Sequence, residues 1–447
     1  MNRIITRYLP VAVILFSALV SYAAAPEPLA ARETLSNGLV LMHSQKSTLP
    51  IVRIVMGIGA GQLADPPGKA GLAGLTASLL KEGTTHRTSR QISEEIEFVA
   101  GSLSASGGGE YATISLSVLK KDLDTGFEIM SDIMLNPAFS DEEIARKKAQ
   151  VKGAIRRRME SPGDVASKAF MKELYPNHTL GFPAEGTPET LDAITRDDIV
   201  SFHRAWYSPD NAWMAVVGDV TRQEAGALID KYLKGWTARG AKLAFQPVPK
   251  LAKTSVIAID KDITQANIIL GHDGPKRSDP DYYAALVMNY ILGGGGFSSR
   301  MMDSIRDNMG LAYDVGSHFL PGRHSGVFTV DMQTKNASAN TAIGEALRQI
   351  ERIRMEPVTD IELAGAKAYI TGSFPLRMDT TAKIANLLSS VEYFGLGMNY
   401  VDDYRKAVEA VTKDDVLRAA KKFLQPDRYV LVVVAKQGEA KIGKFGN

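Results

Sequence analysis

The chain has 447 residues, of which 45% are apolar and 23% charged, and its 52 basic and 50 acidic residues leave a net charge of +2. This balance excludes proteins that bind nucleic acid or an anionic membrane mainly through charge. The sequence contains no cysteine, which excludes thiolate zinc sites, thiol nucleophiles and iron–sulfur clusters. The length predicts more than one domain.

The first 25 residues have the pattern of a secretory signal peptide. Arg3 and Arg7 precede an apolar run over residues 8–20, and small residues follow over residues 21–25. The run is short for a membrane-spanning helix, which needs about 20 residues. We expect residues 1–25 to be removed and the mature protein to be periplasmic or secreted, without a membrane attachment. An uncleaved anchor is the alternative.

The rest of the chain mixes strand patterns with helix patterns. Residues 52–58 and 113–119 are apolar or alternating and rich in β-branched residues, which is typical of strands. Thr195 precedes two aspartates and an amphipathic run, so it is expected to cap a helix. Residues 213–217 and 429–434 are predicted to be short buried strands. Because strands and helices do not alternate strictly, the predicted fold class is α+β rather than doubly wound α/β.

The chain also contains an internal repeat. Residues 194–199 (ITRDDI) match residues 411–416 (VTKDDV) at an offset of 217. Residues 143–159 match residues 362–378 at an offset of 219, through five identical positions. Two independent matches at nearly the same offset predict two homologous lobes of about 210 residues.

The repeat sets the predicted domain boundaries. Residues 26–238 form the first lobe and residues 254–447 form the second. The chain lacks apolar periodicity from residue 236 to residue 255, so this stretch is expected to be exposed, and residues 239–253 are assigned to the linker between the lobes. A linker between two like halves permits a clam-shell arrangement with a cavity between the lobes.

Several segments in both halves resemble one enzyme family. Together they are similar to the inverted-zincin metallopeptidases, which include insulinase, pitrilysin and the mitochondrial processing peptidases. The segments that carry the resemblance are Leu35–Val40, Gly71–Thr84, Trp206–Asn211, Val217–Val220, Leu292–Arg300 and Ile305–Tyr313. The resemblance covers nearly the whole mature chain and implies a two-lobed peptidase fold.

The zinc motif of that family is missing here. Active relatives carry His-x-x-Glu-His on the helix that Gly71–Thr84 resembles. The i and i+4 histidines bind zinc there, the glutamate activates a water, and a distal glutamate completes the site. The matching positions in this chain are Gly74, Ala77, Ser78 and Ala154. None offers a good zinc ligand, so the resemblance implies no bound metal, no cofactor of its own and no catalytic residue of its own.

Two residues of the second-lobe motif are present, namely Arg306 and Tyr313. In the family that the chain resembles, this arginine and tyrosine hold the substrate backbone and stabilise charge on the scissile carbonyl. Some relatives place zinc in one subunit and this pair in another. The resemblance therefore implies a non-catalytic subunit that lends Arg306 and Tyr313 to a homologous zinc-bearing peptidase subunit and to its peptide substrate.

A glycine run precedes that motif, at positions Gly293, Gly294, Gly295 and Gly296. Glycines let a backbone approach a ligand closely, and no Gly-Lys-Ser/Thr follows that would indicate a phosphate loop. The run is either a substrate-recognition loop or a flexible joint between a helix and a loop.

The histidines offer no replacement zinc motif. No pair stands at i and i+4, and we expect them on the surface or in loops, although the loop that holds His318 and His324 leaves room for a metal. They are His43, His86, His178, His203, His272, His318 and His324.

Three other functions remain open. The first is a stand-alone protein that holds extended peptides at a sheet edge. The second is a scaffold in which the lobes serve assembly only, and the third is an active peptidase with a non-standard site. Bound zinc in the isolated chain would favour the last of these.

Overall fold

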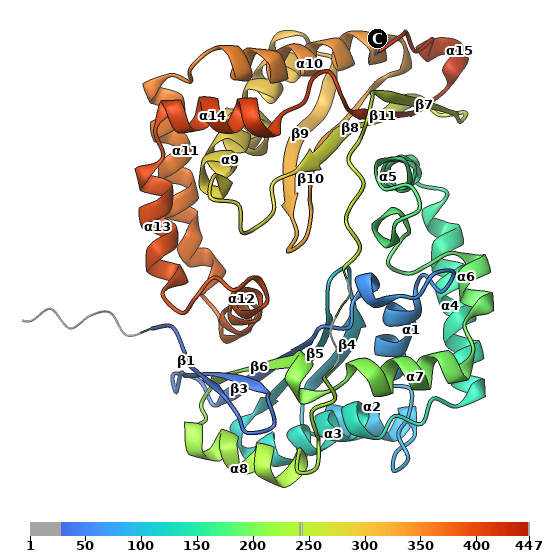
Figure 1. Ribbon diagram of the computed structural model, residues 1–447, viewed down its shortest axis with the longest axis vertical. Helices are drawn as coiled ribbons and strands as arrows, with labels where there is room; N and C mark the ends of the chain where they lie inside the picture. The colour runs from blue at the N-terminus through green and yellow to red at the C-terminus, as the bar shows by residue number, and fades with distance from the viewer. Residues whose placement is uncertain (1–27, 241–242, 244, 446–447) are drawn as a thin grey trace, which may run out of the picture.

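The computed structural model describes residues 28–240, 243 and 245–445 (Figure 1). The predicted signal peptide lies outside these residues. Within them, no helix has both the length and the apolar character needed to cross a bilayer. The chain forms two lobes, each built on one β-sheet, and this α+β architecture confirms the predicted fold class.

The first lobe contains a six-stranded sheet in the order β1-β2-β6-β3-β5-β4. Its strands are β1 (Ala31–Thr34), β2 (Val40–Gln45), β3 (Ile51–Ile58), β4 (Ser102–Gly107), β5 (Ala112–Leu119) and β6 (Ala212–Gly218). The β2–β6 pair is parallel and the other pairs are antiparallel. This arrangement confirms the predicted strands at 52–58, 113–119 and 213–217 and leaves β4 as an edge strand.

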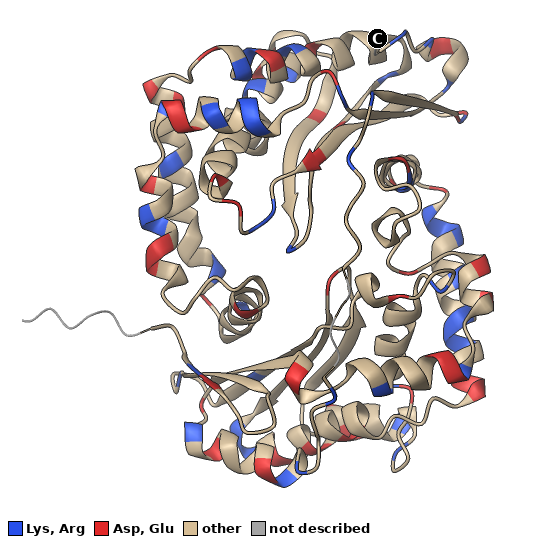
Figure 2. Ribbon diagram, in the orientation of Figure 1, with Lys and Arg blue, Asp and Glu red and all other residues tan. Residues whose placement is uncertain are grey.

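Eight α-helices belong to the described part of the first half. They are α1 (Leu72–Leu79), α2 (Ser89–Phe98), α3 (Leu123–Leu135), α4 (Asp141–Arg158), α5 (Pro162–Leu174), α6 (Pro188–Ala193), α7 (Arg196–Trp206) and α8 (Arg222–Tyr232). Thr195 caps α7, as predicted, in a reciprocal capping box with Asp198. Charges of both signs are interspersed along these outer helices (Figure 2).

The second lobe contains a five-stranded sheet in the order β7-β11-β8-β10-β9. Its strands are β7 (Ser255–Asp260), β8 (Gln265–Gly274), β9 (Ala312–Pro321), β10 (Gly326–Lys335) and β11 (Val430–Ala435). Its α-helices are α9 (Tyr282–Asn289), α10 (Ala339–Met355), α11 (Asp360–Ser373), α12 (Thr381–Phe394), α13 (Tyr400–Ala410), α14 (Lys413–Phe423) and α15 (Gln437–Ala440). Thr412 caps α14 with Asp415, which repeats the capping box of α7 at the predicted offset.

The central strands of the two sheets are buried on both faces. In β6, Met214 and Val216 pack into the core of the first lobe, whereas Trp213 and Ala215 face the opposite side. The outer helices of each lobe cover one face of its sheet. A single helix from the other half of the chain covers the other face.

The two halves exchange helices. Helix α12 packs through Ile384 and Leu388 on the first sheet, where the indole N–H of Trp213 donates a hydrogen bond to Ser389 Oγ at 2.8 Å. Helix α5 packs through Phe170 on the second sheet (Figure 1). Because α5 and α12 are equivalent in the internal repeat, each half of the chain completes the fold of the other.

A second contact joins the lobes at two hairpin turns. The carboxylate of Glu110, between β4 and β5, accepts hydrogen bonds from the backbone N–H of Arg323, between β9 and β10, at 3.0 and 3.1 Å. Burial raises the pKa of Glu110, although hydrogen bonds from Arg323 and Tyr393 oppose this. The lobes therefore meet at this partly buried carboxylate as well as through the exchanged helices.

One expectation about the connecting segment was wrong. The loss of periodicity suggested exposure from residue 236 onward, but Trp236 is only 5% exposed. Its indole N–H donates to the carbonyl of Tyr207 at 3.1 Å, and its ring joins the first core. A single large aromatic side chain packs well without any neighbouring periodicity.

Candidate functional site

Helix α1 carries three of the four positions that correspond to zinc residues in the resembling family. Leu72 and Leu75 are buried and hold the helix in the first core. The carboxylate of Asp65 caps the helix by accepting hydrogen bonds from the backbone N–H groups of Gly71 at 2.8 Å and Ala73 at 2.7 Å. Burial raises the pKa of Asp65 to about 7, against the effect of these two bonds.

Gly74, Ser78 and Ala154 line one pocket of about 350 Å³ between α1 and α4. The structure therefore brings together the positions that the sequence placed 76 to 80 residues apart. Ala77 is fully buried beside them and does not line the pocket. The Ser78 hydroxyl donates to the carbonyl of Leu75 at 2.8 Å and so is already engaged within the helix.

The edge strand β4 closes one side of this pocket. A Cβ atom on Gly107 would lie 2.7 Å from the Cα of Gly74, so strand and helix touch through their glycines. A Cβ atom on Gly74 would lie 3.1 Å from the carbonyl oxygen of Ala184, which a small shift can relieve. The pocket is therefore shaped by backbone contacts at the position where active relatives carry their first histidine.

The residues around the pocket do not fit a zinc ion. The ionisable side chains that line it are Arg158 and Glu185, which form an ion pair with each other. Zinc needs three or four nitrogen, sulfur or carboxylate ligands in a tetrahedral arrangement. In residues 28–240, 243 and 245–445, no three histidine, aspartate or glutamate side chains lie where they could share a metal.

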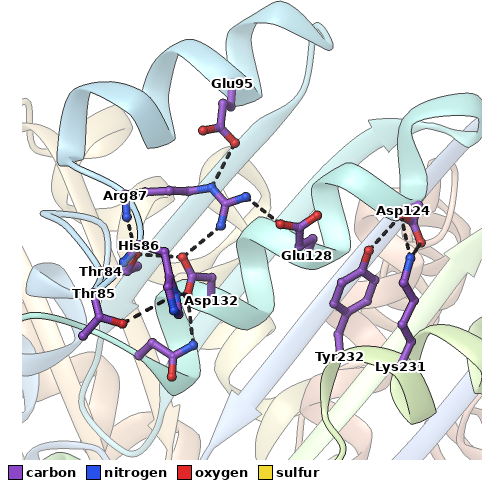
Figure 3. A network of polar contacts seen from close by, with 11 residues as sticks. Thr84, Thr85, His86, Arg87, Glu95, Asp124, Glu128, Asp132, Lys231 and Tyr232 are labelled. Atoms are coloured by element: carbon purple, nitrogen blue, oxygen red, sulfur yellow. Dashed lines mark hydrogen bonds and ion pairs between the residues drawn. The ribbon is translucent and has the colours of Figure 1, made fainter.

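A polar network fixes the segment that follows α1 (Figure 3). Asp132 accepts hydrogen bonds from Thr84 Oγ1 at 2.7 Å and from Arg87 at 3.0 Å, and it contacts His86 Nδ1 at 2.7 Å. Arg87 also binds Glu128 at 2.6 Å. Although burial raises the pKa of Asp132, the bonds from His86 and Thr84 outweigh this and lower it. The network ties the loop between α1 and α2 to α2 through Glu95 and to α3 through Glu128 and Asp132.

The second-lobe residues Arg306 and Tyr313 lie next to each other. The Arg306 guanidinium sits 5.1 Å from the ring centroid of Tyr313 and 4.6 Å from that of Phe297. Its nearest carboxylate, that of Asp307, is 3.9 Å away. Tyr313 is 81% exposed. A cation stacked between two rings, with its donors weakly engaged, suits contact with a polar ligand.

Two π-helical segments position these residues. They span Tyr290–Gly294 and Met302–Asn308, and the second contains Arg306. π-Helices are rare and often lie at functional sites. Tyr313 follows as the second residue of the edge strand β9.

The glycine run is part of this structure rather than one continuous loop. Gly293 and Gly294 end the first π-helical segment, and a Cβ atom on Gly293 would lie 2.5 Å from Ser317 Oγ. Gly296 has a φ of +56° and starts a short 3₁₀ turn. Packing against Ser317 therefore explains the first glycine, and backbone conformation explains the last.

A row of cavities runs between the two candidate regions. The largest, about 640 Å³, lies between α5 and the second sheet, and Tyr313 lines it. It shares Ser167 and Met171 with a smaller cavity of about 190 Å³. That cavity shares Arg158 and Glu185 with the pocket at α1. Neighbouring cavities with common lining residues therefore extend from Tyr313 to the positions that correspond to zinc ligands.

Among the residues that α5 and the second sheet contribute to these cavities, sequence reasoning named His318 only as part of a loop with room for a metal and did not single out Ser167 or Asp331. Ser167 comes from α5, and His318 and Asp331 come from neighbouring strands, with His318 Nε2 3.1 Å from Asp331 Oδ1. The hydrogen bond to Asp331 raises the pKa of His318. Pairing of β9 with β10 places His318 near Asp331, whereas only the helix exchange brings Ser167 of α5 to the second sheet, so no local pattern marks Ser167.

His43 and His272 differ from the expectation of surface or loop positions, because both are buried within strands. His178 is also buried, but it lies in the loop after α5. His324 stacks on Phe245 with ring centroids 4.2 Å apart. An imidazole satisfies its polar atoms with backbone groups and packs well, which explains the burial.

Comparison with known families decides what this architecture is. The family model described as "Insulinase (Peptidase family M16)" matches residues 40–188, and the one described as "Peptidase M16 inactive domain" matches residues 193–370. The chain belongs to the insulinase family, peptidase family M16. The resemblance inferred from the separate sequence segments is thereby confirmed.

Relatives within the M16 family extend along most of the chain. An "Uncharacterized zinc protease" of Rickettsia bellii is 28% identical over 348 residues, which are 78% of this chain and 84% of that protein. A zinc protease of Bacillus subtilis with a similar name is 24% identical over 408 residues, which are 91% of this chain and 98% of that protein. The names of these relatives include zinc, whereas the zinc positions here hold Gly74, Ser78 and Ala154.

Solved M16 structures share the fold. A peptidase M16 inactive domain from Pseudomonas fluorescens has a TM-score of 0.85 and 25% identity, covering 91% of this chain and 98% of that chain. A protease from Helicobacter pylori has the same TM-score at 21% identity, covering 91% and 99%, and shows the fold alone. Family membership and the donor-poor pocket together fit a non-catalytic M16 member.

Proposed function

We propose that this protein is the non-catalytic subunit of a heterodimeric zinc metallopeptidase and binds peptide in its partner's active site. The observation that carries the proposal is the contrast between its two candidate regions. Gly74, Ser78 and Ala154 share a pocket without zinc ligands. Arg306 and Tyr313 keep the residue types that stabilise a peptide carbonyl and lie 5.1 Å apart, from guanidinium to ring centroid.

The chemistry of the pair supports this role. A guanidinium is charged at all working pH values and offers donors in a fixed plane, and a phenol adds one more donor. Donors aimed at an oxygen that becomes negative lower the barrier of peptide hydrolysis. Arg306 has only a distant carboxylate at 3.9 Å, so its donors remain available to a substrate.

The test uses the protein together with its zinc-bearing homologue. Arg306→Ala with Tyr313→Ala should lower the kcat/KM of the mixture about 100-fold, because loss of one oxyanion donor alone costs about that factor. A matched control replaces Arg405 and Phe98 by alanine. Both are exposed, and neither lines the cavities described above.

The result contradicts the proposal if the double variant and the control have the same kcat/KM. The proposal is also contradicted if no zinc-bearing homologue gains activity when this chain is added. Circular dichroism of each variant separates loss of function from loss of fold.

A second candidate is a stand-alone peptide-binding protein. The edge strand β4 pairs on one side only, and its residues Ala105, Ser106 and Gly107 line the pocket at α1. An extended peptide can add to such an edge through main-chain hydrogen bonds. This function would be favoured if the isolated chain bound peptide as tightly as the mixture of the chain with its zinc-bearing homologue does.

We place the mature protein in the periplasm or outside the cell. The support is the signal-peptide pattern of residues 1–25. Amino-terminal sequencing of protein recovered from the periplasmic fraction should start near residue 26. An intact Met1 in that fraction would contradict removal of the segment.

A further inference from the structure

A pocket of about 500 Å³ in the second lobe contains an arginine that has no acidic partner in the part of the chain that the structure describes. Arg277, Arg377 and Lys383 line this pocket, which lies where α12 meets the start of α13. Arg277 is only 7% exposed. Burial of a cation is unfavourable unless other groups compensate the charge, so the surroundings of Arg277 indicate what the pocket accepts.

Tyrosines surround Arg277. Its guanidinium carbon lies 3.8 Å from the ring centroid of Tyr282, 5.6 Å from that of Tyr283 and 5.5 Å from that of Tyr400. One of its N–H groups donates to the hydroxyl of Tyr400 at 3.1 Å. The ring faces stabilise the charge, but neutral hydroxyls do not neutralise it.

Two carboxylates close to Arg277 in sequence bind other cations. Asp279 contacts Lys422 at 2.8 Å, and Asp281 contacts Arg418 at 2.9 Å. Among the residues that the structure describes, no aspartate or glutamate oxygen lies within 4.0 Å of the Arg277 guanidinium nitrogens. Among the described residues, Arg277 thus lacks the carboxylate partner that a buried cation usually has.

The other cations of the pocket add to its positive charge. Arg377 also lacks a carboxylate within 4.0 Å in the described ranges, and its guanidinium lies beside the rings of Phe374 and Tyr404 at 5.6 and 5.7 Å. Lys383 contacts Asp379 at 2.8 Å. With three cations and one neighbouring carboxylate, the pocket favours an anionic group.

The rest of the lining is mainly apolar. Apolar side chains line the pocket together with the cations and with two polar side chains, Asn386 and Ser390. The apolar ones include Leu376, Leu387, Val391, Phe394 and Leu396. Cationic and apolar groups in one pocket suit a ligand that carries an anion and an apolar group close together.

We propose that this pocket binds the carboxylate at the end of a peptide whose last residue is apolar. Guanidinium groups bind carboxylates through paired, charge-assisted hydrogen bonds. A chain end carries its carboxylate and its side chain on the same carbon atom, which matches the distribution of charge and apolar surface. The inference rests on the proposed peptide-binding function and adds a subsite to it.

The experiment compares three labelled decapeptides by fluorescence anisotropy with the full chain. One ends in leucine with a free carboxylate, the second ends in leucinamide, and the third is the amide with an internal aspartate. We expect the free acid to bind about tenfold more tightly than the amide, since hydrogen bonds between charged groups are worth about that much. Tight binding of the third peptide would assign the pocket to acidic side chains and overturn the assignment to a chain end.

Two variants connect the preference to the pocket. Arg277→Gln should abolish the difference between acid and amide. Arg377→Gln should reduce it and leaves the buried arginine in place, so it remains informative if the first variant fails to fold. Arg405→Gln, which removes an exposed arginine paired with Glu409, is the control and should keep the full difference. An unchanged preference in Arg377→Gln, with the fold intact, would overturn the proposal.

A further measurement separates this inference from the proposed function. N-acetyl-leucine should raise the melting temperature of the isolated chain at concentrations where its amide does not. Such a shift without activation of a zinc-bearing partner would support the pocket and contradict the subunit role. Activation of the partner without any preference for the free acid over the amide would support the subunit role and contradict the proposed pocket.

Discussion

At the scale of single residues, the zinc positions are the clearest departure from the activity named for the relatives. Gly74 and Ser78 are four residues apart on α1, the spacing at which two side chains share a helix face. Ala154 lies opposite on α4, and all three line the same pocket. Helix, facing helix and pocket are retained, and only the side-chain donors are missing.

This leads to a prediction about metal binding. The variant Gly74→His, Ser78→His, Ala154→Glu should bind about one zinc ion per chain, because two imidazoles and a carboxylate make a three-ligand site. Mass spectrometry of the dialysed protein measures the metal content. The double variant without the histidine at position 74 is the control and should hold much less zinc. Equal zinc in both variants would show that these positions do not converge on a common point.

The buried His272 supports a second prediction at this scale. Its Nδ1 lies 2.8 Å from the carbonyl of Asp273, and the backbone N–H of Gln425 donates to its Nε2 at 3.1 Å. These partners fit a neutral imidazole with the proton on Nδ1. Burial lowers the pKa of His272 from 6.5 to about 4, against the bond to Asp273.

The sign of the pH effect follows from this lowered pKa. Below pH 6.5 the unfolded chain takes up a proton at this position that the folded chain does not, so acid favours unfolding down to about pH 4. His272 should therefore contribute a loss of about 2 kcal/mol in unfolding free energy between pH 7.5 and pH 5. Urea unfolding at both pH values measures it, with His272→Asn as comparison. Equal losses in the two proteins would contradict the assignment.

At the scale of elements, the exchange of α5 and α12 determines how each sheet is covered. Strand β6 alternates its side chains between the core of its own lobe and α12. Strand β11 does the same between its own core and α5, with Leu431 and Val433 on one side and Val430 and Val432 on the other. The continuous apolar runs of both strands reflect this coverage on both faces.

The exchanged helix α12 should therefore be important for stability. Leu388→Ala removes a fully buried side chain that packs on the first sheet and should lower the free energy of unfolding by about 2–5 kcal/mol. Ile361→Ala, an exposed aliphatic position on α11, is the control and should change it by less than about 0.5 kcal/mol. Chemical denaturation of both variants gives the comparison. A small effect at Leu388 would mean that α12 contributes little to the first lobe.

At the scale of the whole molecule, the exchange and the Glu110 contact join the lobes into one structure. Neither sheet is covered on both faces without a helix from the other half. The linker is thus only one of several connections between the halves. A clam-shell whose halves separate freely would expose the apolar surfaces under α5 and α12.

The two lobes should consequently unfold in a single transition. All three tryptophans, Trp206, Trp213 and Trp236, lie in the first half, so fluorescence reports on that half. Far-ultraviolet circular dichroism reports on helices of both halves. We expect the two signals to have the same urea midpoint, the usual sign of two-state behaviour. Midpoints that differ by more than the error would contradict this coupling.

The sequence by itself determined the family, the two-lobed α+β fold and the loss of zinc ligands. Local patterns carry this information, because the capping box at Thr195, the apolar strand at 213–217 and the residue types at positions 74 and 78 all act over a few residues. The internal repeat extended the same reasoning to the second lobe.

Only the tertiary structure decided which surfaces and charges meet. The exchange of α5 and α12 depends on complementary apolar faces far apart in the chain, such as Trp213 and Ser389, which are 176 residues apart, and no local pattern encodes it. The same holds for Arg277, since Tyr400 lies 123 residues further along the chain. Burial, and with it the shifted pKa of His272 and the unpaired charge of Arg277, is a property of the packed molecule rather than of any segment.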